Sequence, residues 1–185
     1  MRKVIYSMTV SLDGFIAGPG GDISWSGPDE ELHRFHNDRV RKLGAHLLGR
    51  RLYETMVYWE TADRDPSASA VTLDFARIWQ ALPKIVFSTT LESVQGNARL
   101  VSGNVVDELA RLQEEPGGDV EVGGAGLASE LIKRNLIDDY RLFVSPVVLG
   151  SGTPYFPAME GRIDLELLET RTFAGGVQYL HYARA

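Results

Sequence analysis

The sequence contains no cysteine among its 185 residues. Disulfide bonds, thiolate nucleophiles and cysteine-ligated zinc are therefore excluded, together with the zinc-dependent base deaminases that use paired cysteines. Long hydrophobic runs are also absent, because no stretch approaches the roughly 18 apolar residues that a membrane-spanning helix requires. Polar Ser7, Thr9 and Ser11 interrupt the apolar start of the chain. We interpret this segment as a strand rather than a signal peptide and expect a cytoplasmic protein with no membrane partner.

Blocks of basic residues are lacking as well. The chain has 19 Lys and Arg residues against 25 Asp and Glu residues, which gives a formal net charge of -6. This balance argues against a surface that binds nucleic acid or anionic lipid. His33 and His36 are three residues apart, but no further ligand follows at a familiar spacing, so no metal is expected. The expected partner is a small-molecule substrate.

The amino-acid composition is that of an ordinary globular protein. Hydrophobic residues make up 44% of the sequence and charged residues 24%, as in typical folded domains. The length is that of one domain with one core. No linker, internal repeat or low-complexity tract divides the chain. We therefore expect a single domain over residues 1–185.

Strands and helices are predicted to alternate along the chain. β-branched and apolar runs predict strands, whereas apolar residues at helical spacing predict helices. Gly175-Gly176 would form the turn of a C-terminal antiparallel hairpin. The fold class is therefore α/β, with a mixed, mainly parallel sheet flanked by helices. The expected strands are 3–10, 46–48, 84–88, 99–101, 119–122, 140–149, 163–173 and 177–183, and helices are expected at 28–43, from about 50, at 73–82, 105–112 and 127–136.

The glycine-rich turn Gly123-Gly124-Ala125-Gly126 is the strongest functional signal. It joins a predicted strand to a predicted helix, where glycines let the backbone approach a pyrophosphate and the helix start attracts it. A purely structural tight turn is the alternative. Ser129 stands where the ordinary dinucleotide-binding pattern has its third glycine. A different dinucleotide fold is therefore indicated.

A second group of residues could hold another phosphate. Gly49-Arg50-Arg51 places two permanent cations at a predicted helix start, and Ser88-Thr89 offers hydroxyl groups after another strand. Guanidinium groups suit the ribose phosphate that distinguishes NADP from NAD. The alternative is that Arg50 and Arg51 are solvated helix residues.

The order of the predicted strands, helices and turns resembles the dihydrofolate reductase fold over almost the whole chain. Within that fold the chain more closely resembles the reductase domain of bacterial riboflavin synthesis and its stand-alone relatives, the RibD C-terminal domain family. The residues that carry the resemblance are Ser11-Leu12-Asp13-Gly14, Gly123-Gly124 with Leu127, Leu136-Ile137-Asp138-Asp139, and Ser145-Pro146-Val147-Val148-Leu149-Gly150-Ser151-Gly152.

The resemblance implies bound NADPH. Its pyrophosphate would lie near Gly123, Gly124, Ala125, Gly126 and Leu127. Its ribose phosphate would lie near Gly49, Arg50, Arg51, Ser88 and Thr89. It further implies hydride transfer to a small heterocyclic metabolite, as in 5-amino-6-(5-phosphoribosylamino)uracil reductase, and a homodimer.

One position departs from the family. The riboflavin-pathway reductases commonly place a glutamate directly before the glycine pair, whereas this chain has Val122 there. Glu121 comes one residue earlier, and successive side chains of a strand point to opposite faces. Glu121 is therefore expected on the opposite face of the sheet from Val122.

Reduction also needs a group that supplies a proton. Asp13 is the first candidate, because it opens the loop beside the first strand, although an Asp before Gly14 is equally typical of a turn. Glu30 is the second candidate, and its alternative role is to stabilise the start of a helix. Trp25 and Phe35 could stack on a planar substrate, or belong to the core.

Three functions remain open from the sequence. The first is an NADPH-dependent reductase of a small heterocyclic metabolite. The second is dihydrofolate reduction. The third is a non-catalytic NADP-binding module, which the absence of a glutamate directly before Gly123 would allow.

Overall fold

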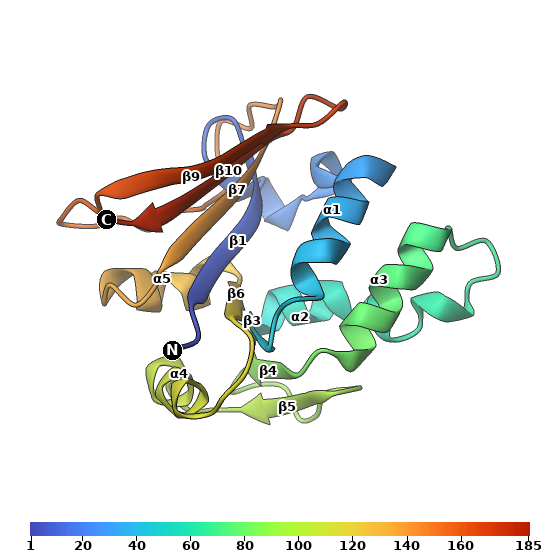
Figure 1. Ribbon diagram of the computed structural model, residues 1–185, viewed down its shortest axis with the longest axis horizontal. Coiled ribbons are helices and arrows are strands. Elements are labelled where there is room, and N and C mark those ends of the chain that lie inside the picture. The colour runs from blue at the N-terminus through green and yellow to red at the C-terminus, as the bar shows by residue number, and fades with distance from the viewer.

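A computed structural model describes all residues from 1 to 185. Its centre is an eight-stranded sheet in the order β5-β4-β3-β6-β1-β7-β10-β9, which crosses the molecule diagonally in Figure 1. The strands are β1 (Val4–Ser11), β3 (Ala45–Gly49), β4 (Lys84–Phe87), β5 (Ala98–Val101), β6 (Val120–Gly123), β7 (Asp139–Ser145), β9 (Leu165–Thr172) and β10 (Gln178–Arg184).

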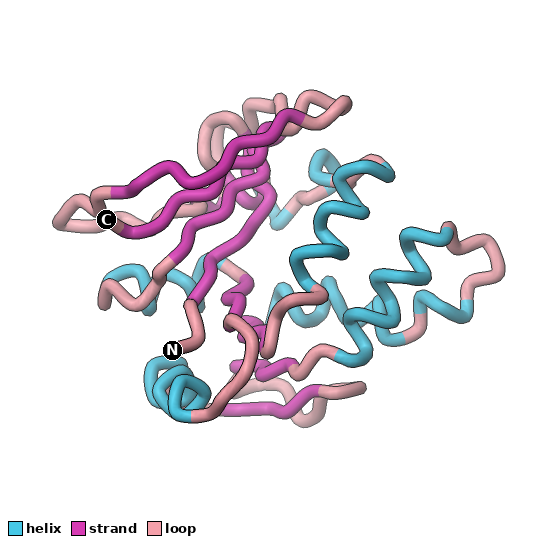
Figure 2. Tube along the Cα trace, in the orientation of Figure 1, coloured by secondary structure: helices cyan, strands magenta, loops and turns pink.

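The sheet is mainly parallel. β1 pairs in parallel with β6 and β7 on its two sides, so the first strand is central. β3, β4 and β5 continue the parallel part. Only β10 runs against its neighbours, β7 and β9. Figure 2 shows these strands as one layer between helices.

Helices cover both faces of the sheet, as the alternation of elements predicts. On one face lie α1 (Glu30–Val40), α2 (Arg50–Met56) and α3 (Ala70–Ala81), whose buried apolar side chains pack on Leu48, Val86 and Phe143. On the other lie α4 (Val105–Glu114) and α5 (Ala125–Lys133), which pack with Val4, Tyr6 and their neighbours in the largest core cluster. No helix combines the length and the apolar character needed to cross a membrane.

The C-terminal hairpin forms where the sequence predicts it. Gly176 has a φ of 82°, a conformation that glycine adopts without the steric cost of a Cβ atom. Its N–H donates to the carbonyl of Phe173, and the N–H of Phe173 donates to the carbonyl of Val177. These bonds close the turn between β9 and β10.

Most element boundaries differ from the prediction by a few residues, and two boundaries and one additional pair of strands have a clear physical reason. The strand expected at 140–149 ends at Ser145, because Pro146 has no N–H to continue the ladder. Pro28 lies before α1 instead of inside its first turn, since Asp29 caps the helix by accepting from the N–H of Leu32. The loop after β1 also contains β2 (Phe15–Ala17), which pairs with β8 (Thr153–Pro154); strands this short leave no periodic signal.

Candidate active site

The glycine turn lies at the end of a central strand. β6 runs between β1 and β3 and ends at Gly123. A Cβ atom on Gly123 would lie 2.4 Å from Cδ2 of Leu52, so only glycine allows α2 to approach this closely. Gly124 has a φ of 96° and is the N-cap residue of α5. Gly124 is therefore required by its backbone conformation and Gly123 by the close packing of the Leu52 side chain, and α5 starts at the end of the sheet.

The turn forms one wall of a surface groove, which we call the outer groove. Its cavity volume is about 470 Å³. Seven of the ten residues predicted to bind a cofactor line it, and no carboxylate does. The lining residues are Met8, Ile16, Ala17, Gly21, Ile23, Gly49, Arg50, Arg51, Leu52, Thr55, Gly124, Ala125, Gly126, Leu127 and Thr153.

The predicted hydroxyl groups lie beside the groove rather than in it. The guanidinium of Arg50 donates to Oγ1 of Thr90 over 3.2 Å. Oγ of Ser88 accepts from the N–H groups of Thr90 and Leu91, which uses its acceptor capacity locally. Thr89 is exposed. The structure therefore brings Arg50 to the strand end that carries Ser88, but through Thr90.

A second cavity, which we call the inner cavity, adjoins the outer groove. Both are lined by Met8 and Leu52, so the two spaces meet at these side chains. The inner cavity has a volume of about 250 Å³ and lies on the face of the sheet covered by α1, α2 and α3. It is lined by Ser7, Met8, Thr9, Pro28, His33, His36, Val40, His46, Leu52, Met56, Trp59, Phe75, Trp79, Glu121 and Phe143.

Two polar side chains meet at the sheet side of this cavity. Glu121 on β6 and His46 on β3 are opposite each other in the strand register, and Nε2 of His46 lies 3.7 Å from Oε1 of Glu121. Burial raises the pKa of Glu121 to about 7. Burial, with the nearby charge of Lys84, lowers the pKa of His46 to about 4. Near neutral pH the imidazole is therefore uncharged and the carboxyl group is partly protonated.

His46 is short of hydrogen-bond partners. Its side chain is buried, and neither ring nitrogen has a partner within the protein. A buried polar group without a partner costs about 1–3 kcal/mol. The pair of Glu121 and His46 is thus an unsatisfied polar patch in a largely apolar cavity, which is typical of a place where a ligand binds.

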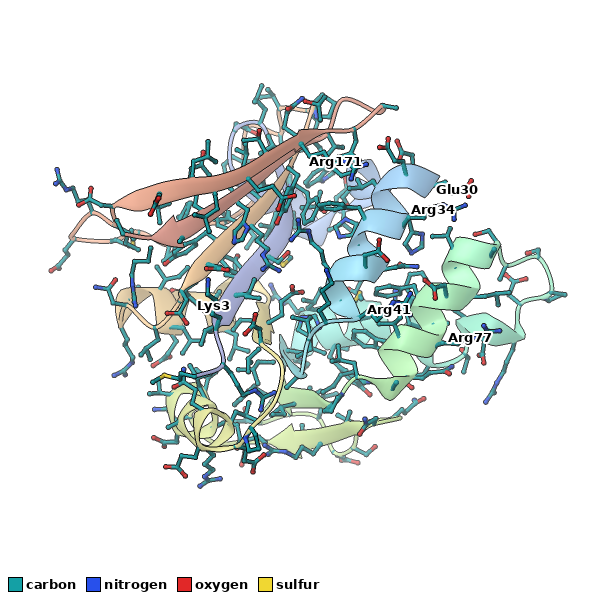
Figure 3. The ribbon with its side chains drawn as sticks, in the orientation of Figure 1. Lys3, Glu30, Arg34, Arg41, Arg77 and Arg171 are labelled. Carbon is teal, nitrogen blue, oxygen red and sulfur yellow. The ribbon has the colours of Figure 1, made fainter.

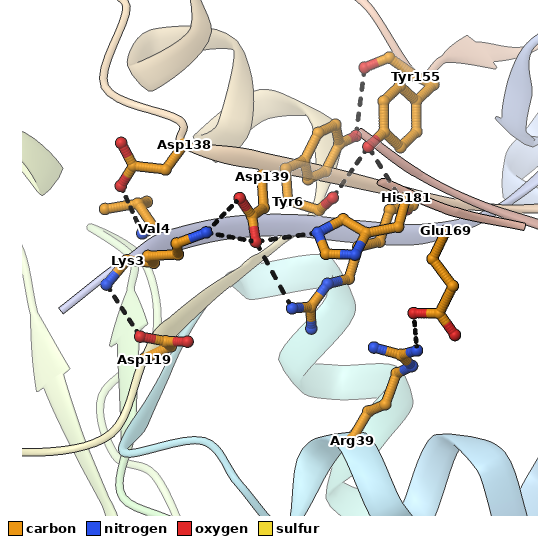
Figure 4. A network of polar contacts seen from close by, with 11 residues as sticks. Lys3, Val4, Tyr6, Arg39, Asp119, Asp138, Asp139, Tyr155, Glu169 and His181 are labelled. Atoms are coloured by element: carbon orange, nitrogen blue, oxygen red, sulfur yellow. Dashed lines mark hydrogen bonds and ion pairs between the residues drawn. The ribbon is translucent and has the colours of Figure 1, made fainter. Parts of the chain in front are cut away.

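The cations near Glu121 are paired with other carboxylates. Arg39 on α1 forms an ion pair of 2.7 Å with Glu169. Arg141 on β7 lies 3.7 Å from Asp139, which also accepts from Lys3 and contacts His181 (Figure 4). These arginines lower the pKa of Glu121 less than burial raises it, and neither lines the inner cavity.

Asp13 is held in the loop after β1. Its carboxylate accepts from Oγ of Ser11 over 2.7 Å, and from the N–H groups of Leu149 and Gly150. These bonds, chiefly that from Ser11, lower the pKa of Asp13. A carboxylate stabilised in its ionised form is a poor proton donor at neutral pH. The contacts of Asp13 therefore favour its turn-forming role, in which it ties two loops together.

The other predicted residues lie outside both cavities. Glu30 forms an ion pair with Arg34 one helical turn away, and Figure 3 shows both on the outward side of α1. Phe35 packs edge-on against Phe143, Phe173 and Tyr179, in the core. The indole of Trp25 donates to the carbonyl of Asp22. The aromatic rings that line the inner cavity are instead Trp59, Phe75, Trp79 and Phe143.

Sequence reasoning identified Glu121 only in part. It placed Glu121 opposite Val122, and this is confirmed, because Val122 lies in the core under α4 and α5 while Glu121 lines the inner cavity. Its partner His46 was read only as part of a buried strand. The sequence does contain a signal for this pair, because a histidine and a glutamate are each unusual within a buried strand.

The geometry defines a class of protein: an α/β fold with a glycine-rich strand-to-helix turn beside a partly open cavity lined by aromatic side chains. The profile of the RibD C-terminal domain matches residues 2–179. The chain therefore belongs to the RibD C-terminal domain family, and its fold is of the dihydrofolate reductase type. Membership places it among reductase-like proteins related to riboflavin biosynthesis.

Two relatives in Bacillus subtilis (strain 168) match over nearly their full length. The uncharacterised protein YyaP is 31% identical over 182 residues, which are 98% of this chain and 94% of YyaP. The uncharacterised protein YwjB is 32% identical over 187 residues, covering 100% of this chain and 99% of YwjB. The chain is thus similar to stand-alone proteins of its own length.

Solved structures confirm the fold. A putative riboflavin biosynthesis protein from Shewanella sp. PV-4 has a TM-score of 0.75 at 22% identity and covers 100% of this chain and 99% of its own. A diaminohydroxyphosphoribosylaminopyrimidine deaminase/5-amino-6-(5-phosphoribosylamino)uracil reductase from Thermotoga maritima has a TM-score of 0.69 at 18% identity. The match covers 100% of this chain and 57% of the longer Thermotoga maritima chain.

Proposed function

We propose that the protein is an NADPH-dependent reductase that transfers hydride to a small cyclic metabolite. The observation that carries this proposal is the continuity of two cavities of different character. A groove with two arginines and a glycine turn joins, at Met8 and Leu52, a cavity lined by aromatic rings and one protonatable carboxyl group. The reductases of the family supply the reaction class.

The outer groove fits a dinucleotide. Gly126 lies in the first turn of α5, and a Cβ atom built on it would meet nothing within 4 Å. The open space above this turn would take the pyrophosphate, which the N–H groups at the start of α5 would bind. Arg50 and Arg51 would bind the ribose phosphate through charge-assisted hydrogen bonds.

The inner cavity fits the hydride acceptor. When bound, NADPH supplies a hydride through its nicotinamide ring. Trp59, Phe75 and Phe143 would exclude water and contact the flat face of the acceptor. The carboxyl group of Glu121 would hold the proton that the reduced product needs, since its raised pKa of about 7 lies near the working pH.

Cofactor titration tests the proposal directly. NADPH should quench the fluorescence of the tryptophans, two of which, Trp59 and Trp79, line the inner cavity. At a free concentration of about 100 times Kd it should add about 2.7 kcal/mol to the free energy of unfolding, a rise in Tm of roughly 5–10 °C for a chain of this size. Absence of both effects would refute the proposal.

Turnover separates the proposal from its two alternatives. NADPH oxidation, followed by its absorbance, should accelerate with a cyclic compound that carries a carbon able to accept hydride, such as a quinone or an aminopyrimidine with a ribosylamino group. Acceleration by dihydrofolate alone would instead establish dihydrofolate reduction. Tight binding of NADPH without oxidation by any acceptor would establish a non-catalytic NADP-binding module.

A further inference from the structure

The inner cavity contains no permanent positive charge. None of its lining residues is Lys or Arg. Its three histidines are His33, His36 and His46, and burial lowers the pKa of each, to about 4 for His36 and His46. All three imidazoles are therefore uncharged at neutral pH. The only acidic side chain on the cavity wall is Glu121.

The cations behind the cavity wall are already paired with carboxylates. Lys84 pairs with Glu60 over 3.2 Å and donates to two backbone carbonyls. Arg39 has Glu169 as its partner and lies over the rings of Phe35 and Tyr179. Arg141, paired with Asp139 as described above, is likewise behind the wall. A ligand in the inner cavity would meet none of these charges directly.

We propose that the inner cavity binds an uncharged, flat ring, hydrogen-bonded along one edge by Glu121 and His46, and that it rejects phosphorylated substrates. This proposal rests on the proposed function, because the arginines of the outer groove are assigned there to the cofactor. It goes beyond it by naming the substrate class. It also separates this chain from the Thermotoga maritima enzyme, whose name specifies a phosphoribosyl substrate.

Electrostatic interactions make the binding of a phosphate group in this cavity unfavourable. A phosphate monoester carries about −1.5 to −2 charges at neutral pH, and a buried charge without a partner costs several kcal/mol. The carboxyl group of Glu121 adds repulsion when it is ionised. The cavity volume of about 250 Å³ also lies below the roughly 300–1,000 Å³ of pockets for drug-sized ligands. A ring fits this space better than a ring that carries a ribose phosphate.

The side chains of Glu121 and His46 explain why the cavity should prefer a heterocyclic ring. A protonated carboxyl group offers one donor and one acceptor, and a neutral imidazole offers the same. These groups match the alternating N–H and C=O groups on the edge of an aminopyrimidine or a similar heterocycle. Binding would give a hydrogen-bond partner to one ring nitrogen of His46, which has none within the protein. The surrounding aromatic rings would cover the faces of the ligand.

A matched series of ligands tests the proposal. Isothermal titration calorimetry would use 5,6-diaminouracil, 5-amino-6-(ribosylamino)uracil and its 5-phosphate, with 1,4-naphthoquinone as an uncharged ring of other chemistry, each on the protein with and without NADPH. We expect at least one uncharged ring to bind with Kd below about 1 mM, and the phosphate to bind at least tenfold more weakly than the unphosphorylated compounds. Equal or tighter binding of the phosphate would overturn the proposal, as would the absence of binding by every uncharged ring.

Two variants locate the binding site. Glu121→Gln keeps the shape of the side chain but fixes one donor, so the preferred ring should lose at least about fivefold in affinity, whereas NADPH affinity should stay within about twofold. Glu114→Gln, at an exposed position on α4, is the matched control and should change neither. Unchanged ring affinity in Glu121→Gln would overturn the assignment of the polar edge. If the unmodified protein did not bind NADPH, the proposed function would be contradicted instead. Failure of the proposed function and failure of the ring-binding proposal therefore give different results.

Discussion

Glu121 places an acidic side chain on a buried face of the sheet, where an apolar residue would stabilise the fold better. Burial raises its pKa to about 7, so the folded protein binds a proton that the unfolded chain releases at neutral pH. Such a group lowers the stability of the fold. A destabilising acidic side chain beside His46 in a cavity is typical of a functional residue.

Glu121→Gln should therefore stabilise the protein at high pH while lowering turnover. Because the folded-state pKa is raised from 4.5 to about 7, the free energy of unfolding of the unmodified protein falls as pH rises through this window, by up to about 3 kcal/mol. The variant lacks this slope. Urea unfolding at about pH 5 and pH 8 would measure it. A variant with the same pH slope as the unmodified protein would contradict the raised pKa.

At the residue scale, the sequence located Glu121 through the alternation of side chains along β6 and Gly124 through its place between strand and helix. It could not identify the aromatic lining, because Trp59 and Phe75 reach the cavity from α3 and the segment before it, far from Glu121 in sequence. The sequence makes Asp13 a candidate because of its position beside β1. Its actual hydrogen bonds, to Leu149 and Gly150, depend on a contact between distant loops.

At the scale of elements, the first turn of α5 affects both the stability of the helix and the proposed binding of the cofactor. Gly126 has open space where a Cβ atom would lie. In a helix, alanine is more stable than glycine by roughly 0.5–1 kcal/mol. The glycine at this position thus weakens the helix slightly and keeps the outer groove open.

Gly126→Ala separates these two effects. We expect Tm to stay constant or rise, while Kd for NADPH increases at least about tenfold, because the added methyl group would occupy the space proposed for the pyrophosphate. Differential scanning fluorimetry and fluorescence titration would measure the two quantities. Gly161→Ala, which lines neither the outer groove nor the inner cavity, is the control. Unimpaired NADPH binding in Gly126→Ala would remove the pyrophosphate from this turn.

The start of α2 should determine the choice between cofactors. The double variant Arg50→Ala/Arg51→Ala removes two guanidinium groups from the outer groove. Charge-assisted hydrogen bonds contribute about 1.5–3 kcal/mol each, so affinity for NADPH should fall at least about tenfold and affinity for NADH much less. Arg134→Ala on the far end of α5, outside the groove, is the control. Equal losses for both cofactors would contradict the ribose-phosphate assignment.

The order of elements was predictable because each leaves a local pattern. The strands, the helices and the hairpin at Gly175-Gly176 follow from apolar periodicity and turn residues. Their boundaries shifted where a single residue dominates, as at Pro146, which ends β7, and Asp29, which caps α1. β2 and β8 depend on each other for pairing across the chain and have no local signal.

At the scale of the whole molecule, one of the two edges of the sheet carries exposed apolar side chains. β9 forms this edge, and Leu167 and Leu168 on it are 52% and 48% exposed. Unpaired edge strands with apolar side chains readily associate. We propose a homodimer that covers β9.

Light scattering would test the dimer. The measured mass should be twice the chain mass of 20.5 kDa, and the double variant Leu167→Glu/Leu168→Glu should reduce it to one chain by placing like charges at the contact. A monomer for the unmodified protein would contradict the proposal. A dimer that withstands the double variant would place the interface elsewhere.

The central claim is that one continuous site holds NADPH in the outer groove and its acceptor in the inner cavity. A crystal structure of the protein with NADPH tests it most directly. We predict the pyrophosphate against Gly124, Ala125 and Gly126, and the reactive carbon of the nicotinamide at Met8 and Leu52, facing Glu121. Density for NADPH elsewhere, or a nicotinamide turned away from the inner cavity, would contradict the account.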